Sequence, residues 1–171
     1  EMSSVVSQGR ELGTHLYMFT GGEPLIRKDD IIKLCEANPD CAFLSYTNGT
    51  LVDEKFCDEM VRVGNIALAL SVEGDEESND ARRGAGMYQK VIDAMHLLKK
   101  KGCLFGMSVC YTSKNIEKVT SDEFLDKMVD LGCKFGLYFN YMPVGKDAVP
   151  ELIPAPAQRK HMYHWLRRMR K

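Results

Sequence analysis

The chain has 171 residues, of which 44% are hydrophobic and 27% are charged, a composition typical of a folded domain with a sizeable core. A length of this order predicts one domain, residues 1–171. The formal net charge of -1 argues against nucleic acid as the main partner, and no apolar run reaches the ~20 residues needed to span a bilayer.

The first residue of the chain and the spacing of its cysteines indicate whether the sequence is a fragment and in which cellular compartment the protein folds. The first residue is Glu1 and no signal peptide is recognisable, so we expect the sequence to be a fragment of a longer protein. No two cysteines form a CxxC pair, and several lie in helical or strand patterns, where a free cysteine behaves as a small hydrophobic residue. This argues against a disulfide framework and favours the reducing cytoplasm. The six cysteines are Cys35, Cys41, Cys57, Cys103, Cys110 and Cys133.

Short apolar runs bounded by turn residues predict buried strands. In chain order the five predicted strands cover residues 16–20, 42–46, 66–70, 104–110 and 135–141. The runs are apolar throughout, as expected when both faces of a sheet are covered.

Apolar residues at helical spacing predict amphipathic helices between these strands and at both ends of the chain. In chain order the apolar stripes cover residues 2–12, 31–35, 56–61, 87–98, 124–129 and 162–169. Asp29 or Asp30 is the predicted N-cap of the second helix, and Asp53 that of the third. Thr120 and Glu123 form a predicted capping box for the fifth helix.

Strand and helix therefore alternate five times, which predicts right-handed βαβ units and an α/β fold with one parallel sheet whose five strands follow one another in chain order. The segment from Asp75 to Gly84 is interpreted as a polar loop, with Arg82 and Arg83 as surface charges rather than anion ligands. The turns that follow the strands share the carboxyl edge of the sheet, where barrels and open α/β sheets bind their ligands.

Four polar turn motifs lie at or next to predicted strand ends. They are Gly21-Gly22-Glu23-Pro24, Thr47-Asn48-Gly49, Ser71-Val72-Glu73-Gly74 and Met142-Pro143-Val144-Gly145. In the first motif, two glycines without Cβ atoms let the backbone pass close to a bulky group. Glu23 offers an acceptor there, and Pro24 stiffens the exit from the turn.

Together these four motifs resemble the radical S-adenosylmethionine (radical SAM) superfamily, whose second signature is the GGEP turn. The pattern is most similar to the branch that includes the molybdenum-cofactor cyclase and the SPASM and twitch enzymes. The run Arg83-Gly84-x-Gly86-x-Tyr88-x-x-Val91 also resembles the segment before the fourth helix of that branch. The resemblance implies a partial (β/α) barrel with helices outside, made of barrel strands two to six.

The resemblance also implies the chemistry of the full-length protein. Members of this superfamily cleave S-adenosylmethionine reductively at a 4Fe–4S cluster, and the resulting 5′-deoxyadenosyl radical abstracts hydrogen from a substrate. This implies an iron–sulfur, oxidoreductase-type enzyme of peptide or protein modification, or of cofactor and haem maturation, with an external electron donor.

One feature of the superfamily is absent from this sequence, because no CxxxCxxC motif for the cluster thiolates is present. We therefore expect the cluster loop, strand one and a C-terminal domain to be missing from this chain. By itself it is expected to bind neither cofactor and to be inactive.

Site residues follow from the resemblance alone. The implied cofactor-binding residues are Gly21, Gly22, Glu23, Pro24, Asn48, Ser71, Glu73 and Met142. Gly22 is expected at the methionyl part of the cofactor, Ser71 at its carboxylate or ribose, and the backbone of Met142 at its adenine. Thr47 matches a substrate-side position. No catalytic residue and no metal ligand is assigned, and none of the four histidines is placed like a metal ligand.

Two alternatives stay open: an inert truncated barrel, and an unrelated (β/α) barrel enzyme such as an aldolase or a phosphosugar isomerase. The second is disfavoured because no lysine lies in a strand end and no glycine-rich phosphate turn follows the last strand. The strand over 16–20 contains neither charge nor proline, so its exposed edge predicts self-association of the chain.

Overall fold

The computed structural model describes residues 2–146 and 148–170. Its sheet has five strands in the order β1-β2-β3-β4-β5, and every neighbouring pair is parallel. The strands are β1 (Leu16–Phe19), β2 (Ala42–Thr47), β3 (Ile66–Ser71), β4 (Phe105–Tyr111) and β5 (Gly136–Asn140). The predicted sequential parallel sheet is confirmed, and each predicted strand boundary lies within one residue of the observed one.

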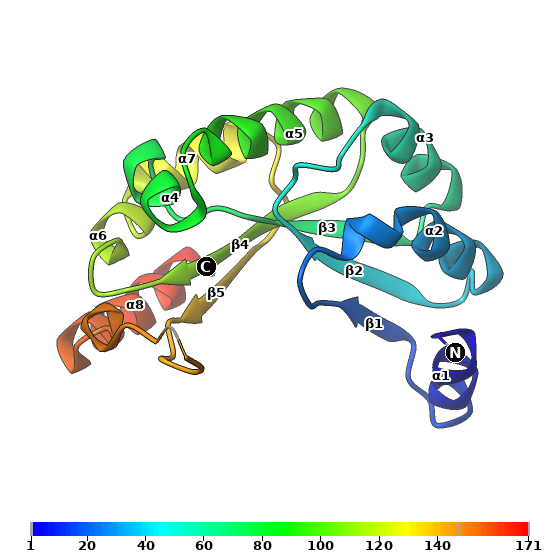
Figure 1. The fold of residues 1–171 in the computed structure, drawn as a ribbon, viewed down its shortest axis with the longest axis horizontal. Helices are drawn as coiled ribbons and strands as arrows, with labels where there is room; N and C mark the ends of the chain where they lie inside the picture. Colours follow the sequence, from blue (N-terminus) through cyan, green and yellow to red (C-terminus); the bar gives the residue numbers. More distant parts are fainter. Residues whose placement is uncertain (1, 147, 171) are drawn as a thin grey trace.

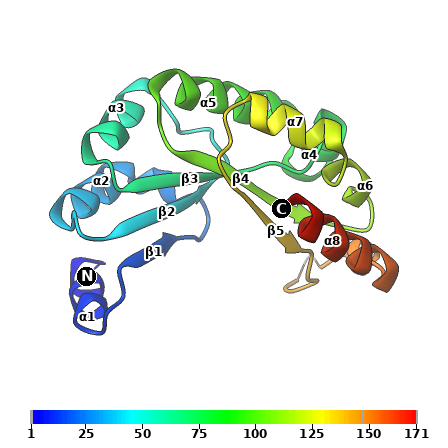
Figure 2. The ribbon, with the colours of Figure 1, turned by 180° about the vertical axis from the view of Figure 1, so that it is seen from behind.

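Helices connect the strands and cover one face of the sheet. They are α1 (Met2–Glu11), α2 (Lys28–Ala37), α3 (Glu54–Val63), α4 (Glu76–Arg83), α5 (Met87–Lys101), α6 (Ile116–Val119), α7 (Asp122–Asp130) and α8 (Pro156–Met169), with short 3₁₀ helices η1 (Pro24–Arg27) and η2 (Pro150–Leu152). Figures 1 and 2 show α2 to α7 arching over one face, with α1 beside β1 and α8 beside β5. The sheet curls away from these helices and forms a partial barrel with an open concave face (Figure 1).

The alternation of side chains along each strand separates these two faces. On β3, Leu68 and Leu70 point to the helices and are fully buried in the core, while Ala67 points to the concave side. On β1, Leu16 and Met18 point to the concave side and are each 59% exposed. Both faces of the sheet were expected to be covered. In the described chain this holds only for the face under the helices, and the concave face is partly exposed at β1.

The predicted cap of α2 is wrong. The helix starts at Lys28, directly after η1, so Asp29 and Asp30 lie in its first turn and Arg27 takes the N-cap position. Asp30 instead accepts a hydrogen bond from Arg27 Nε at 2.6 Å. The predicted cap of α3 is confirmed, because Asp53 accepts from the backbone N–H of Phe56 at 2.8 Å.

The predicted capping box of α7 is wrong, because the N-cap lies one residue later and has Phe124, not Glu123, three residues after it. Ser121 is the N-cap and accepts from the N–H of Phe124 at 3.1 Å. The hydroxyl of Thr120 instead donates to the carbonyl of Ile116 at 2.7 Å, because Thr120 ends the short helix α6, which no apolar stripe announces.

The polar loop expected between Asp75 and Gly84 is a helix, α4. Its sequence is almost free of apolar residues, so hydrophobic periodicity could not reveal it. Its N-terminus is capped by Asp75, which accepts from the N–H of Ser78 at 3.0 Å. Buried polar contacts, described below, hold the rest of the helix.

All six cysteines carry free thiols. Within residues 2–146 and 148–170, no helix combines the length and the apolar composition that crossing a bilayer requires.

Candidate functional site

The carboxyl ends of the five parallel strands lie along one edge of the sheet, and the four turn motifs begin at or next to the ends of β1, β2, β3 and β5. The strand order therefore agrees with the prediction that the four motifs share the carboxyl edge of the sheet. Each motif is built differently, and the contacts of its residues decide what it offers to a ligand.

The first turn exposes two glycines, and only one of them is required by the backbone conformation. Gly21 has φ = +126°, a conformation that favours glycine whatever surrounds it. Gly22 has no such backbone requirement, and a Cβ atom added to it would meet no atom of the described chain within 4 Å. By contrast, a Cβ at Gly49 would lie 3.3 Å from the Cβ of Ala94, so that glycine serves internal packing. Nothing within the described chain requires Gly22 to lack a side chain.

Glu23 joins the first turn to the second. Its Oε1 accepts from the N–H of Leu25 at 3.0 Å and from the hydroxyl of Thr47 at 2.8 Å. Its Oε2 accepts from the N–H of Asn48 at 2.8 Å. A carboxylate has about four acceptor positions, so this geometry fixes the group and leaves room for one more donor. Pro24 follows at the first position of η1, where its fixed φ suits a helix start.

Thr47 and Asn48 are occupied within their own turn. Thr47 is 2% exposed, and its Oγ1 accepts from the N–H of Gly49 at 3.1 Å. The Oδ1 of Asn48 accepts from the N–H and the hydroxyl of Thr50, at 2.9 and 2.6 Å. The substrate role of Thr47 and the cofactor role of Asn48 stay predictions, and both side chains visibly stabilise the turn.

Glu73 is fully buried, at 0% exposure, and both of its carboxylate oxygens have partners. Oε1 accepts from Arg83, through Nε at 2.9 Å and through a second guanidinium nitrogen. Oε2 accepts from the N–H of Cys110 at 3.1 Å and pairs with Nη1 of Arg82 at 3.1 Å. The cofactor contact expected of Glu73 stays a prediction; in this structure the carboxylate links α4 to β4.

The interpretation of Arg82 and Arg83 as surface charges is wrong in part, because their side chains, 33% and 26% exposed, both pair with Glu73. Both guanidinium groups, on the last turn of α4, neutralise the buried charge of Glu73, which would otherwise be costly. Burial of Arg82 is the largest single influence and lowers its pKa, but attraction and hydrogen bonding to Glu73 and Cys110 together outweigh it, so the pKa of Arg82 lies above its ordinary value. The sequence signal was a glutamate at a strand end followed, one helix later, by two arginines.

Further polar groups complete this buried cluster. The buried Asn79 accepts from the N–H of Glu73 at 3.2 Å, and Asn115 donates to the carbonyl of Glu73 at 3.1 Å. Asp80, also on α4, accepts from the N–H of Tyr88 at 2.8 Å and so caps the start of α5. These contacts explain why α4 is ordered without an apolar stripe.

Ser71 and Met142 have fewer contacts. Ser71 is the last residue of β3, half-buried, and lies opposite Ser108 of β4 in the register. Met142 follows β5 and is 66% exposed. Their placement on the carboxyl side agrees with a cofactor role, which stays a prediction for both.

Two other features lie away from this edge. At the amino edge, His15, Asp40 and Cys41 bring one potential metal ligand each within 4.8 Å of one another, an arrangement that the sequence did not suggest. However, Asp40 already pairs with Arg10 at 2.9 Å.

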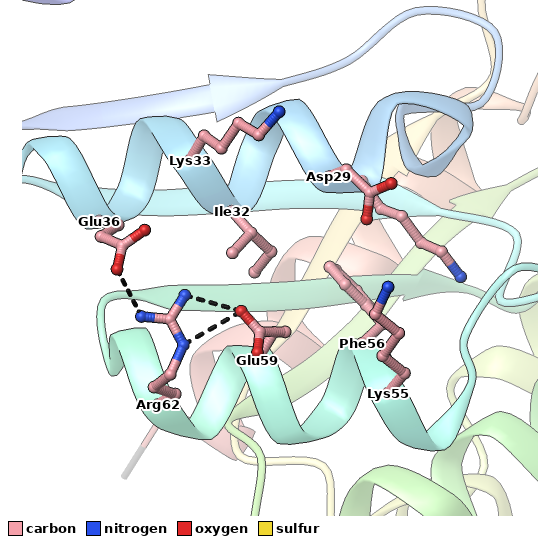
Figure 3. A pocket seen from close by; sticks show the side chains of 9 residues that line it. Asp29, Ile32, Lys33, Glu36, Lys55, Phe56, Glu59 and Arg62 are labelled. Carbon is pink, nitrogen blue, oxygen red and sulfur yellow. Dashed lines mark hydrogen bonds and ion pairs between the residues drawn. The ribbon is translucent and has the colours of Figure 1, made fainter.

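The second feature is a groove of about 420 Å³ between α2 and α3 (Figure 3). Its floor holds Ile32 and Phe56, and Arg62 bridges Glu36 and Glu59 along its rim. It lies on the helix side of the sheet, so it does not belong to the site at the strand ends.

A curled parallel sheet with polar turns along its carboxyl edge defines the (β/α)-barrel class of protein, whose members bind their ligands at that edge. The sequence profile of the Radical SAM superfamily matches residues 2–126, and the chain belongs to this superfamily.

Relatives and solved structures agree with this assignment. An AdoMet-dependent heme synthase of Methanosarcina barkeri is 26% identical over 176 residues, which cover 100% of this chain and 49% of the relative. A pre-heme d1 synthase of Dinoroseobacter shibae is 31% identical over 119 residues, 64% of this chain and 29% of that protein. Streptococcus suis SuiB, solved with bound S-adenosylmethionine, shares the fold with a TM-score of 0.79 and a sequence identity of 16%. The superposition covers 98% of this chain and 40% of the SuiB chain. The chain thus spans about half the length of the first of these relatives.

The residues present fit S-adenosylmethionine but not the cluster. The open surface at Gly22 and the spare acceptor capacity of Glu23 suit the amino-acid end of the cofactor. The six thiols are dispersed over the fold, and among the described residues the only close group of potential metal ligands contains a single cysteine. A 4Fe–4S cluster needs several thiolates, so its ligands are not found among these residues.

Proposed function

We propose that this chain is the cofactor-binding part of a radical SAM enzyme. Superfamily membership supports the reaction class, and one observation supports the location of the site. Gly22 is exposed at the carboxyl edge, without a backbone or packing reason to be glycine within the described chain. A bound ligand that needs the space of a Cβ atom supplies that reason.

Each residue has a proposed task in this site. The backbone carbonyls of the Gly21-Gly22 turn and the Oε2 atom of Glu23 accept hydrogen bonds from the ammonium group of the cofactor. The hydroxyl of Ser71 donates to its carboxylate or ribose, and the backbone of Met142 contacts its adenine. When bound at a reduced cluster, S-adenosylmethionine supplies a 5′-deoxyadenosyl radical, and the protein supplies position and exclusion of water.

The proposed substrate class is a tetrapyrrole or another cofactor precursor. Relatives named as heme synthase, Fe-coproporphyrin III synthase and pre-heme d1 synthase support this choice. Modification of a peptide is the second candidate, supported by relatives named mycofactocin maturase and PqqA peptide cyclase. An external electron donor completes the proposed set of partners.

Formation of 5′-deoxyadenosine tests the proposal. The whole protein, with its cluster assembled and reduced, is incubated with S-adenosylmethionine, and the product is measured by chromatography. Gly22→Val should abolish cofactor binding, measured by calorimetry, because its side chain fills the open surface. Ala157→Val on the exposed side of α8 is the control and should bind normally. Absence of 5′-deoxyadenosine from the unaltered protein would refute the proposal, and unchanged affinity in Gly22→Val would refute the location of the site.

Self-association of the 171-residue chain is a separate proposal. In the described residues β1 pairs on one side only, with β2, and the exposed Leu16 and Met18 adjoin its open edge. An apolar open edge is a template for pairing with a second chain. Light scattering should detect dimers that Met18→Lys dissociates, and a monomer at all concentrations would contradict the proposal.

A further inference from the structure

Two free thiols meet where helix α3 faces the segment between α5 and β4. Cys57 lies in the first half of α3, and Cys103 lies between the end of α5 and the start of β4. The Sγ atom of Cys103 is 3.5 Å from the carbonyl oxygen of Cys57, and the two thiols hydrogen-bond to each other. Residues 46 positions apart in the sequence therefore bring their thiols into contact.

Other contacts hold these two segments together independently of the thiols. The ammonium group of Lys101, on the last turn of α5, pairs with Asp58 at 2.8 Å and with Glu54 at 3.6 Å, both on α3. The backbone N–H of Cys103 donates to the carbonyl of Leu98 at 3.0 Å, which ties this residue to the end of α5. Because these contacts fix both backbones, the two thiols stay adjacent in the folded protein.

The two thiols differ in access and in acidity. Cys57 is fully buried, at 0% exposure, whereas Cys103 is half-buried and therefore reachable from solvent. The hydrogen bond from Cys57 lowers the pKa of Cys103, although burial opposes it, and Lys101 assists. The same hydrogen bond, together with burial, raises the pKa of Cys57. Since the thiolate is the reactive form, Cys103 is the nucleophile of the pair and Cys57 is the protonated thiol beside it.

We propose that Cys57 and Cys103 form a modification site at which hydrogen peroxide closes a reversible disulfide. The thiolate of Cys103 attacks one peroxide oxygen, the O–O bond breaks and hydroxide leaves, which gives a sulfenic acid. The sulfur of Cys57 then attacks the sulfenic sulfur; the S–O bond breaks, and the departing hydroxide takes the proton of Cys57 and leaves as water. In total, two thiols lose two electrons and two protons, and one peroxide is reduced to two waters.

Cys133 provides a matched comparison within the chain. It follows Gly132 at the end of α7 as Cys103 follows Gly102 at the end of α5, and both glycines have positive φ, +104° and +73°. Both cysteines are half-buried and precede a strand. Burial, however, raises the pKa of Cys133 to about 12. Its position and exposure resemble those of Cys103, but its thiolate is not stabilised, so Cys133 should resist peroxide.

Peptide mapping of the whole protein tests the inference. The reduced protein is treated with hydrogen peroxide, remaining thiols are blocked with N-ethylmaleimide, and the protein is digested without reductant for mass spectrometry. The peptide with Cys57 should be joined to the peptide with Cys103, and dithiothreitol should separate them. Cys133 should be modified at least about tenfold more slowly than Cys103, because the thiolate fraction falls tenfold with each pKa unit. The map identifies each cysteine separately, so cysteines outside residues 1–171 do not affect the result.

Three variants separate the roles of the thiols. Cys57→Ala should leave the sulfenic acid on Cys103, where dimedone traps it, and Cys103→Ser should leave Cys57 unmodified. Cys133→Ser is the control and should form the same disulfide as the unaltered protein. Circular dichroism should show the same fold for all variants, and the peptide map of the unaltered protein decides the question even if Cys57→Ala fails to fold.

Three results would overturn the inference: maleimide on both Cys57 and Cys103 after peroxide treatment, a disulfide from either of them to another cysteine, or modification of Cys133 as fast as that of Cys103. Cys103 precedes β4, so this site lies away from the carboxyl edge. Its oxidation does not depend on the proposed function, and neither result decides the other.

Discussion

Two glutamates at the carboxyl edge make the same connection in contrasting surroundings. Glu23, after β1, binds the end of β2, and Glu73, after β3, binds the backbone of β4. Glu23 is half-buried and uses neutral donors only, whereas Glu73 is fully buried between two guanidinium groups. The first arrangement leaves an acceptor and two open glycines facing outward, and the second leaves nothing free. The difference separates a turn with a free acceptor from one whose acceptors are all used by contacts within the described chain.

The largest expected effect is at Glu73. Glu73→Gln removes the negative charge and leaves Arg82 and Arg83 without compensation in a partly buried site. The free energy of unfolding should fall by about 3–5 kcal/mol, the usual cost of breaking a buried ion pair. Urea denaturation measures it. A loss as small as that of an exposed ion pair would show that Glu73 is not the structural centre of this region.

Substitution of Glu23 should lower the free energy of unfolding by less than substitution of Glu73. Glu23→Gln places an amide group where the carboxylate accepts from Thr47 or Asn48, so one of these bonds is lost. We expect a loss of about 1–3 kcal/mol in the same urea experiment. If Glu23→Gln cost more than Glu73→Gln, the proposed contrast between the two regions would be reversed.

Two glycines sharpen the comparison between open and packed turns. Gly49→Ala introduces a side chain at φ = +82° and 3.3 Å from Ala94, so it should cost about 1–2 kcal/mol. Gly22→Ala meets no atom within 4 Å and should change stability by less than about 0.5 kcal/mol. Thermal unfolding of the two variants compares them. Equal losses would remove the argument that Gly22 is reserved for a ligand.

Among the interactions whose loss should destabilise the protein, the smallest effect is expected at Asp75, beside the Glu73 cluster. A hydrogen bond with Ser78 is the main cause that lowers its pKa to about 2, and Lys118 at 3.0 Å assists. The unfolded chain, with an ordinary pKa of about 3.9, takes up the proton first as the pH falls. The stabilisation is therefore complete above about pH 4 and is lost towards pH 2; for this partly exposed group it amounts to about 1 kcal/mol. The free energy of unfolding of Asp75→Ala should lack this component of the pH dependence. Identical pH profiles of stability for the variant and the unaltered protein would contradict the assignment of this component to Asp75.

The sequence predicted the sheet well because each strand is a continuous apolar run between turn residues. The order of the strands followed from short βαβ connections, which leave few alternatives. The prediction from the sequence failed at α4 and at the cap of α7, where polar contacts between distant residues replace local periodicity. Arg83 illustrates the reason: its partner Glu73 lies on another element, and no spacing rule connects a strand end with the last turn of the next helix.

The site was predicted in outline only. Turn motifs after strands identified the carboxyl edge, because that placement depends on topology alone. The rings of Tyr46 on β2 and Phe139 on β5 have centroids 6.1 Å apart, and this contact could not be predicted in this way because it depends on how strongly the sheet curls. The burial of Thr47 and Glu73 likewise depends on which neighbouring donors they meet in three dimensions.

The sequential order of the strands has a consequence for how the protein is made. Among the described residues each strand pairs only with strands next to it in the sequence, so none of these five strands depends on a partner from the far end of the sheet. Contacts that are local in sequence form faster than distant ones, because less chain entropy is lost in closing the loop. On the ribosome, the sheet can therefore grow one strand at a time in the direction of synthesis, and β1 and β2 can pair before β5 has been translated.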